Sequence, residues 1–193
     1  GAAPTVVGTA AGRHIAGPPR SGTHLYIVGL APSGAGKDYP LRCIAEILAA
    51  ADMRQHIGPS QFISMPAVIN FLARSPLSVC AMDEFGSFLK RINSRKASGF
   101  EGAISGLLRT AWGASFAAMT TPEWAGKTSE TIFSPAMSIF GASTAREFYE
   151  SLEGADVTNG VLNRFLVIET KQRPQEQEAS REPISPSIIS RLS

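Results

Sequence analysis

Two spacings of hydrophobic residues alternate along the chain. Short apolar runs rich in β-branched and aromatic residues predict buried strands at residues 24–30, 77–82, 136–142 and 161–168, with a further short strand at 131–133. Apolar positions three or four residues apart predict helices starting near Gly36 and covering 66–74, 85–92, 103–112 and 145–152. Strands that alternate with helices favour an α/β fold with a mainly parallel sheet flanked by helices.

The two ends of the chain differ from this pattern. Residues 1–23 are rich in Gly, Ala and Pro without helical or strand periodicity, and residues 170–193 are polar, charged and interrupted by proline. Both segments have the composition of linkers. We therefore expect one domain at residues 24–169 of the 193, with flanking segments that connect it to further domains of a longer polypeptide.

Composition narrows the function classes only moderately. The formal net charge of +2 neither indicates nor excludes a nucleic-acid partner. Cys43 and Cys80 lie in apolar patterns far apart, which favours buried thiols in a reducing compartment over a disulfide framework. No apolar run approaches the roughly 20 residues that span a bilayer. We expect a cytoplasmic protein without a membrane partner.

A glycine-rich segment between the first strand and helix points to phosphate binding. Residues 31–38, "APSGAGKD", follow the pattern G-x-x-x-x-G-K-[ST] of a Walker A loop, and Pro40 places the helix start at the loop because proline is tolerated only in the first turn. Backbone N–H groups of such a loop surround phosphate, and Lys37 would reach the β and γ oxygens of ATP. The predicted nucleotide-binding residues are Pro32, Ser33, Gly34, Ala35, Gly36, Lys37, Asp38 and Tyr39.

Two positions in the loop depart from the pattern. Ala31 replaces the first glycine, and Asp38 replaces the hydroxyl residue that binds Mg²⁺. A carboxylate is a good ligand for a hard cation, so Asp38 would hold Mg²⁺ directly or through water. The alternative is structural, because an acid in the first helical turn is favoured by the helix dipole and Arg42 at i+4 offers an ion pair.

A second acidic motif follows the strand at residues 77–82. In "LSVCAMDEFGSFL", Asp83 and Glu84 have the form of a Walker B motif, in which Asp83 would hold Mg²⁺ through water and Glu84 would orient and activate the attacking water. The alternative is that the two acids are only hydrated side chains at the end of a strand, without a role in binding. Since parallel strands bring their carboxyl ends to one edge, the two motifs together favour a nucleotide site there.

Two later motifs carry further candidates. Ser143 and Thr144 end a predicted strand, where a polar residue would sense the γ-phosphate or position water, whereas Thr144 followed by Glu147 also fits a helix cap. Arg164 interrupts the apolar strand predicted at 161–168. A buried arginine is costly unless it is paired. It would act on a neighbouring subunit's nucleotide as an arginine finger, or form a salt bridge with Asp156 or Glu169.

Basic residues follow the predicted helix at 85–92. They would contact a nucleic-acid backbone, or they are only hydrated side chains at the end of a helix. The residues are Lys90, Arg91, Arg95 and Lys96.

Taken in order, "APSGAGKD", "VCAMDEFGSFL", "AMSIFGAST" and "GVLNRFLV" resemble the P-loop ATPase domain of prophage and plasmid primase–helicase-type proteins over residues 24–169. The resemblance implies a P-loop NTPase with a RecA/AAA-like core, in which an additional strand lies between the P-loop and Walker B strands. It implies ATP and Mg²⁺ as cofactors, ring assembly that is often hexameric, and DNA as a partner. By position, Lys37 is the phosphate lysine, Asp83 the metal-linked acid, Glu84 the base, Ser143 the sensor-like residue and Arg164 the finger.

The expected function is therefore an ATP-hydrolysing, helicase-like motor domain of a mobile-element replication system. Two alternatives stay open: a nucleotide-binding switch or assembly module with weak hydrolysis, and a DNA-packaging or transposition-helper ATPase.

Overall fold

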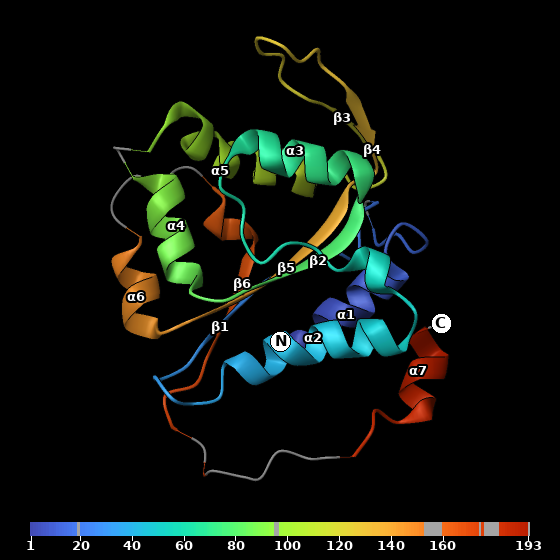
Figure 1. The fold of residues 1–193 in the computed structure, drawn as a ribbon, viewed down its shortest axis with the longest axis vertical. Helices are drawn as coiled ribbons and strands as arrows, with labels where there is room; N and C mark the ends of the chain where they lie inside the picture. The colour runs from blue at the N-terminus through green and yellow to red at the C-terminus, as the bar shows by residue number, and fades with distance from the viewer. Residues whose placement is uncertain (19, 95–96, 153–159, 174, 176–181, 193) are drawn as a thin grey trace.

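A four-stranded parallel sheet organises the chain (Figure 1). Its strands, in order across the sheet, are β2 (Leu77–Met82), β5 (Ala136–Ser143), β1 (Tyr26–Leu30) and β6 (Phe165–Glu169). Every neighbouring pair is parallel, so the α/β class and the parallel sheet predicted from the alternating pattern are confirmed. The computed structural model describes residues 1–18, 20–94, 97–152, 160–173, 175 and 182–192.

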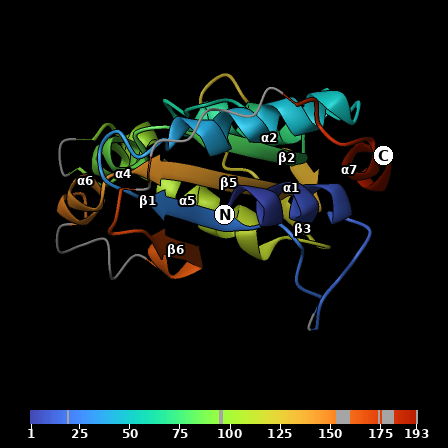
Figure 2. The same cartoon turned by 90° about the horizontal axis from the view of Figure 1, so that it is seen from below.

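Helices cover both faces of the sheet. Helices α1 (Ala2–Ala11) and α2 (Asp38–Ala50) pack on one face, and α3 (Met65–Arg74), α4 (Phe85–Asn93) and α5 (Gly99–Gly113) enclose the larger core on the other. Figure 2 shows α2 and α5 on opposite sides of the strands. Because side chains alternate along a strand, Ile27 faces the α1–α2 cluster while Tyr26 and Val28 face the other.

Smaller elements complete the described chain. They are the 3₁₀ turns η1 (Arg54–His56) and η2 (Leu162–Arg164), the antiparallel pair β3 (Ala118–Thr120) and β4 (Thr131–Phe133), and helices α6 (Ala145–Glu150) and α7 (Pro186–Leu192). Most predicted elements agree with these bounds within a few residues. The sequence pattern did not reveal β3, α1 or α7.

Helix α1 corrects the expectation of an irregular N-terminal segment. Its buried residues include Thr5, Gly8 and Thr9, at helical spacing but without the apolar character on which the periodicity test depends. Thr9 Oγ1 donates to the Thr5 carbonyl oxygen at 2.9 Å and lies 3.2 Å from Ser138 Oγ on β5. A Cβ added at Gly8 would come within 2.3 Å of the Thr23 carbonyl oxygen. Small and hydroxyl residues thus let this helix approach the sheet closely.

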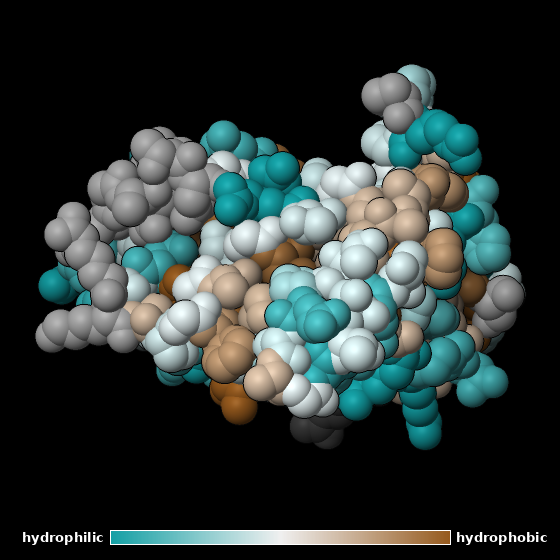
Figure 3. All heavy atoms as spheres, turned by 90° about the horizontal axis from the view of Figure 1, so that it is seen from above, coloured by the Kyte–Doolittle hydropathy of each residue, from teal (hydrophilic) through white to brown (hydrophobic). Residues whose placement is uncertain are grey.

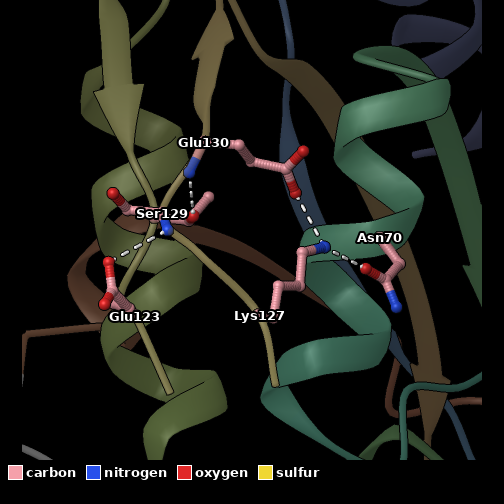
Figure 4. A network of polar contacts seen from close by, with 6 residues as sticks. Asn70, Glu123, Lys127, Ser129 and Glu130 are labelled. Atoms are coloured by element: carbon pink, nitrogen blue, oxygen red, sulfur yellow. Dashed lines mark hydrogen bonds and ion pairs between the residues drawn. The ribbon is translucent and has the colours of Figure 1, made fainter. Parts of the chain in front are cut away.

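The hairpin of β3 and β4 projects from the body of the molecule and is tied to α3 (Figures 1 and 4). Lys127 Nζ lies 2.8 Å from Glu130 Oε1, donates to Asn70 Oδ1 on α3, and is 5.6 Å from the Trp124 ring centroid. The charge of Lys127 is therefore compensated within the protein. This cation links the hairpin to α3 through Asn70.

The surface mixes hydrophilic and hydrophobic residues on the face seen in Figure 3. Exposed apolar side chains such as Ile63 and Phe100 are ordinary on a protein surface when they occur singly. Among the described residues, none of the helices combines the length and apolarity needed to cross a membrane.

His24, just before β1, generates a prediction about pH. Burial lowers the pKa of His24 to about 4, against the opposing effect of a backbone hydrogen bond at Trp112. The ring also lies 2.9 Å from Ser115 Oγ. The unfolded chain, with a pKa near 6.5, binds a proton before the folded chain does. Stability present above pH 6.5 should therefore fall by up to about 3 kcal/mol as the pH drops toward 4. His24→Phe should flatten this part of a denaturant-derived stability profile, and the exposed-site control His14→Phe should not. Parallel profiles for all three proteins would contradict the assignment.

Candidate functional site

The carboxyl ends of all four strands meet at one edge of the sheet, on the left of Figure 1. At this edge β1 leads into the glycine-rich loop, and β2 leads into Asp83 and Glu84. Leu30 pairs with Ser143, and Met82 pairs with Gly141, so β5 separates the two motifs. Two strand spacings place the loop and the acids about 10 Å apart across the sheet. The topology therefore brings the two predicted motifs to one site.

The loop between β1 and α2 has the backbone of a tight, glycine-dependent turn. Gly34 and Gly36 adopt φ values of +70° and +74°, which L side chains rarely adopt. The Ala31 N–H donates to the Ser143 carbonyl oxygen at 3.2 Å, and the Ala35 N–H donates to the Pro32 carbonyl oxygen at 3.3 Å. Because a Cβ added at Gly36 would meet nothing within 4 Å, the loop is open on that side.

Lys37 folds back over the start of the loop. Its Nζ donates to the carbonyl oxygens of Ala31 and Pro32 at 3.2 and 3.0 Å. The helix begins at the next residue, Asp38, close to the start that Pro40 predicted. A cation and the N-terminus of a helix therefore lie together at this loop, and both favour an anion.

Asp38 does not form the ion pair proposed for it with Arg42. The Arg42 Nε lies 3.3 Å from Glu46 Oε1, and its guanidinium carbon is 5.7 Å from the Tyr39 ring centroid. Among the residues that the structure describes, Asp38 takes part in no ion pair. Asp38 and Tyr39 are both exposed beside the loop. The carboxylate of Asp38 is thus accessible to a cation from solvent.

Asp83 and Glu84 form the turn between β2 and α4. Asp83 Oδ1 accepts a hydrogen bond from the Glu84 N–H at 2.8 Å. Glu84 has φ 49° and ψ 43°, the left-handed region, which costs a non-glycine residue about 1–2 kcal/mol. Both acids are exposed. Such strain persists where the surrounding structure imposes it and is frequent at functional sites.

Phe85 holds this turn in place. Its side chain is fully buried, and a Cβ added at Gly141 of β5 would come within 2.5 Å of its ring. Its ring centroid also lies 5.1 Å from that of Phe165 on β6. The two acids are therefore attached to an aromatic anchor in the core, and their backbone has little freedom to relax.

Ser143 and Glu147 link three elements at the same edge. Ser143 Oγ accepts from the Gly86 N–H at 3.3 Å and donates to Glu147 Oε2 at 3.1 Å, and Ser87 Oγ donates to Glu147 Oε1. The Ser143 side chain is buried in these contacts. They favour a role in positioning the acidic turn over the direct phosphate contact that the resemblance implies.

Thr144 caps α6, which confirms the helix cap predicted as the alternative role of this residue. Its Oγ1 accepts a hydrogen bond from the Glu147 N–H at 3.2 Å. From the sequence, Glu147 was predicted only as the partner of that cap. Ser143 ends β5 and Glu147 lies in the first turn of α6, so their closeness in sequence, across the cap at Thr144, was the available signal for the bond between them.

Arg164 lies elsewhere than predicted. It ends η2, and β6 begins only at Phe165, so the strand expected at 161–168 starts later. Its register position is beside Leu25, six residues before Ala31, or about 20 Å from the loop along the strand. Arg164 is thus at the amino edge and does not serve the loop of its own chain.

The alternatives for the charge of Arg164 also change. Its Nη1 donates to the Gly160 carbonyl oxygen at 2.6 Å, while Glu169 accepts from Tyr149 Oη. No ion pair joins Arg164 to Glu169 in the described part of the chain. Asp156 lies outside the described residues. In the described part of the chain, the partner of the Arg164 guanidinium is therefore a carbonyl oxygen.

The predicted basic patch is only partly described, since Arg95 and Lys96 lie outside the described residues. Arg91 Nη2 donates to the Phe62 carbonyl oxygen at 2.7 Å, and its guanidinium carbon is 5.7 Å from the Phe88 ring centroid. Lys90 is exposed. Arg91 therefore serves packing, and Lys90 is the described member of the patch that faces solvent.

The described residues contain no group of three or more His, Cys, Asp or Glu side chains arranged to hold a metal. Mg²⁺ does not require one, because it is typically bound by one or two carboxylates together with phosphate oxygens and water. Asp38 and Asp83, both exposed at this edge, supply carboxylates of that kind. The donor set therefore fits Mg²⁺ bound with a nucleotide.

Comparisons of the sequence with models of protein families and with curated proteins gave no match.

Close packing of Gly86 against Ser143 and Glu147 predicts a local stability effect. A Cβ at Gly86 would lie 2.9 Å from Ser143 Oγ and from Glu147 atoms. Gly86→Ala should therefore lower the free energy of unfolding by about 1–3 kcal/mol. The control Gly99→Ala, where a Cβ would meet nothing within 4 Å, should be neutral or stabilising. Chemical denaturation measures both, and equal effects would contradict the proposed interlock.

Proposed function

We propose that this chain is an ATP-hydrolysing domain with a P-loop NTPase fold of the RecA/AAA-like, additional-strand type. The observation that carries the proposal is the strand order β2-β5-β1. It sets a glycine-rich loop with a lysine on one side of an intervening strand and an acidic pair on the other, all at one sheet edge. Ligands of open α/β sheets bind at this edge.

Binding would use the loop residues from Pro32 to Tyr39. Their N–H groups and the start of α2 favour phosphate, and the Lys37 ammonium would exchange its contacts with the Ala31 and Pro32 carbonyl oxygens for phosphate oxygens. Such an exchange favours the anion, because a hydrogen bond between charged groups is stronger than one to a neutral carbonyl. Asp38 and Asp83 would hold Mg²⁺, which neutralises charge on the triphosphate.

Hydrolysis would depend on Glu84. Its carboxylate would orient a water molecule for attack on the γ-phosphorus and accept a proton from it, releasing ADP and phosphate. The left-handed backbone of Glu84 and the buried Phe85 limit the directions in which that carboxylate can point. Ser143 and Glu147 would support this geometry through the Gly86 N–H. They act here as positioning residues.

Assembly into a ring of subunits, with a hexamer as the form implied by the resemblance, is part of the proposal. Two observations support it. Arg164 lies too far from its own loop to contact nucleotide there, so a role as a finger requires a neighbour. Strand β6 is an edge strand on which Leu166, Val167 and Ile168 are 58%, 40% and 42% exposed, and edges of this kind are commonly covered.

The assignment to a helicase-like motor on DNA, in a prophage or other mobile element, depends on the sequence resemblance. A nucleotide switch with weak hydrolysis is the second candidate, because Asp38 stands where the metal-binding hydroxyl is expected. A DNA-packaging or transposition-helper ATPase would share the same site. Turnover in the presence and absence of single-stranded DNA distinguishes a DNA-stimulated motor from a switch.

Lys37→Ala and Glu84→Gln should separate binding from chemistry. Lys37→Ala should weaken ATP binding, whereas Glu84→Gln should retain binding and reduce turnover by about 10²-fold or more, because a positioned base is lost. Lys90→Ala, which removes an exposed lysine on α4, is the matched control when turnover is measured without DNA. Calorimetric titration and phosphate release measure the two quantities, alongside the mass of the oligomer. Turnover unchanged in both site variants would refute the mechanism.

Asp38→Ala and Asp38→Ser test the metal assignment. If Asp38 ligates Mg²⁺, Asp38→Ala should raise the Mg²⁺ concentration for half-maximal turnover by about tenfold or more. Asp38→Ser should restore much of the affinity, because a hydroxyl is the ligand usual at this position. The control Glu46→Ala removes another acid of α2, which pairs with Arg42. An identical Mg²⁺ dependence in all variants would show that Asp38 is not a ligand.

A further inference from the structure

The segment after β6 runs beside the glycine-rich loop. Strand β6 is parallel to β1, and Glu169 pairs with Leu30. The segments that follow these two strands therefore leave the sheet at the same point. The Thr170 N–H continues this pairing by donating to the Leu30 carbonyl oxygen at 2.9 Å. The topology therefore brings residues 170–173 alongside Ala31 and the residues that follow it.

Arg173, on this segment, lies against the loop. An ideal Cβ built on Gly34 would be 3.7 Å from the Arg173 guanidinium carbon and 3.7 and 3.8 Å from its two terminal nitrogens. These nearly equal distances place the guanidinium group, rather than the aliphatic stem, next to Gly34. A Cβ at this position would be in ordinary van der Waals contact with the guanidinium group, so it is the φ of +70° that favours glycine there.

Two cations thus converge on one loop from different parts of the chain. Lys37 comes from the start of α2 and contacts the carbonyl oxygens of Ala31 and Pro32. Arg173 comes from beyond β6 and lies at Gly34, between those carbonyls and the helix start in sequence. A planar guanidinium group presents paired donors that match two oxygens of one phosphate.

We propose that Arg173 is a phosphate-binding residue that acts on nucleotide in its own chain and contacts the terminal phosphate of a nucleoside triphosphate. This inference rests on the proposed nucleotide site and extends it. Arg173 differs from Arg164, which lies at the opposite edge of the sheet. Hydrolysis removes the terminal phosphate, and the diphosphate therefore lacks the group that Arg173 would contact. Arg173 would thus bind the triphosphate in preference to the diphosphate.

Arg173→Ala in the full chain tests the proposal, with Arg173→Lys as the conservative variant. The matched control is Lys171→Ala, because Lys171 is an exposed cation on the same segment. Calorimetric titrations with ATP and with ADP measure affinity, and thermal unfolding monitors the fold. Arg173→Ala should weaken ATP binding by at least about tenfold, as expected for loss of a charge-assisted hydrogen bond. It should weaken ADP binding by less than about threefold, the size of an exposed charge effect.

Arg173→Lys should recover part of the preference for ATP over ADP, and Lys171→Ala should resemble the wild type. Wild-type ATP binding that is unaltered by Arg173→Ala would overturn the role of Arg173 while leaving the proposed function intact. An equal loss of ATP and ADP affinity would overturn the assignment to the terminal phosphate. Failure of the wild type to bind either nucleotide would overturn both the proposed function and this inference.

Discussion

The parallel hydrogen bonding of β1, on one side to β5 and on the other to β6, is the constraint on which the site depends. It brings the ends of these strands, and of β2 beyond β5, to a single edge. The loop with Lys37, the turn with Asp83 and Glu84 and the segment with Arg173 each follow one of these strands, and Ser143 is the last residue of β5. Antiparallel pairing of any one strand would move its polar residues to the opposite edge. Convergence of these groups is therefore a property of topology, and it does not require any of the four segments to be close in sequence.

The edge is supported by close packing between glycine and larger neighbours. Phe85 occupies the space over Gly141, and Gly86 leaves room for Ser143 and Glu147. These contacts join β5, α4 and α6 immediately behind the acidic turn, where Glu84 retains a left-handed backbone. A strained acid next to a rigid core is a preorganised arrangement, because the surrounding packing, rather than the residue's own preference, decides its conformation. The same glycines make the edge sensitive to the addition of a single methyl group.

The spacing of apolar residues predicted helices and strands correctly wherever the buried side chains are apolar. The strand at 77–82 and the helix at 66–74 were predicted within one residue, since a short continuous apolar run and helical spacing report directly which positions are buried. The same test failed for α1, whose buried face consists largely of threonine and glycine. It also placed Arg164 inside a strand, because apolar neighbours do not distinguish a 3₁₀ turn from the strand that follows it. Arg42 has an acid four residues away on either side, Asp38 and Glu46. The sequence does not decide between them, and in the structure Arg42 pairs with Glu46.

By itself, the sequence determined the alternation of strands and helices, the glycine-rich loop with its lysine, and the acidic pair that follows a buried strand. These are local properties, set by side-chain periodicity, by proline at a helix start and by glycine in turns. The tertiary structure alone decided that β5 lies between the two motifs, that Ser143 and Glu147 join behind Glu84, and that Arg173 reaches Gly34. The physical reason is that strand order and the contacts of loop side chains depend on pairing between distant segments. That pairing is selected by burial of the whole core and leaves no periodic signal in any one of them.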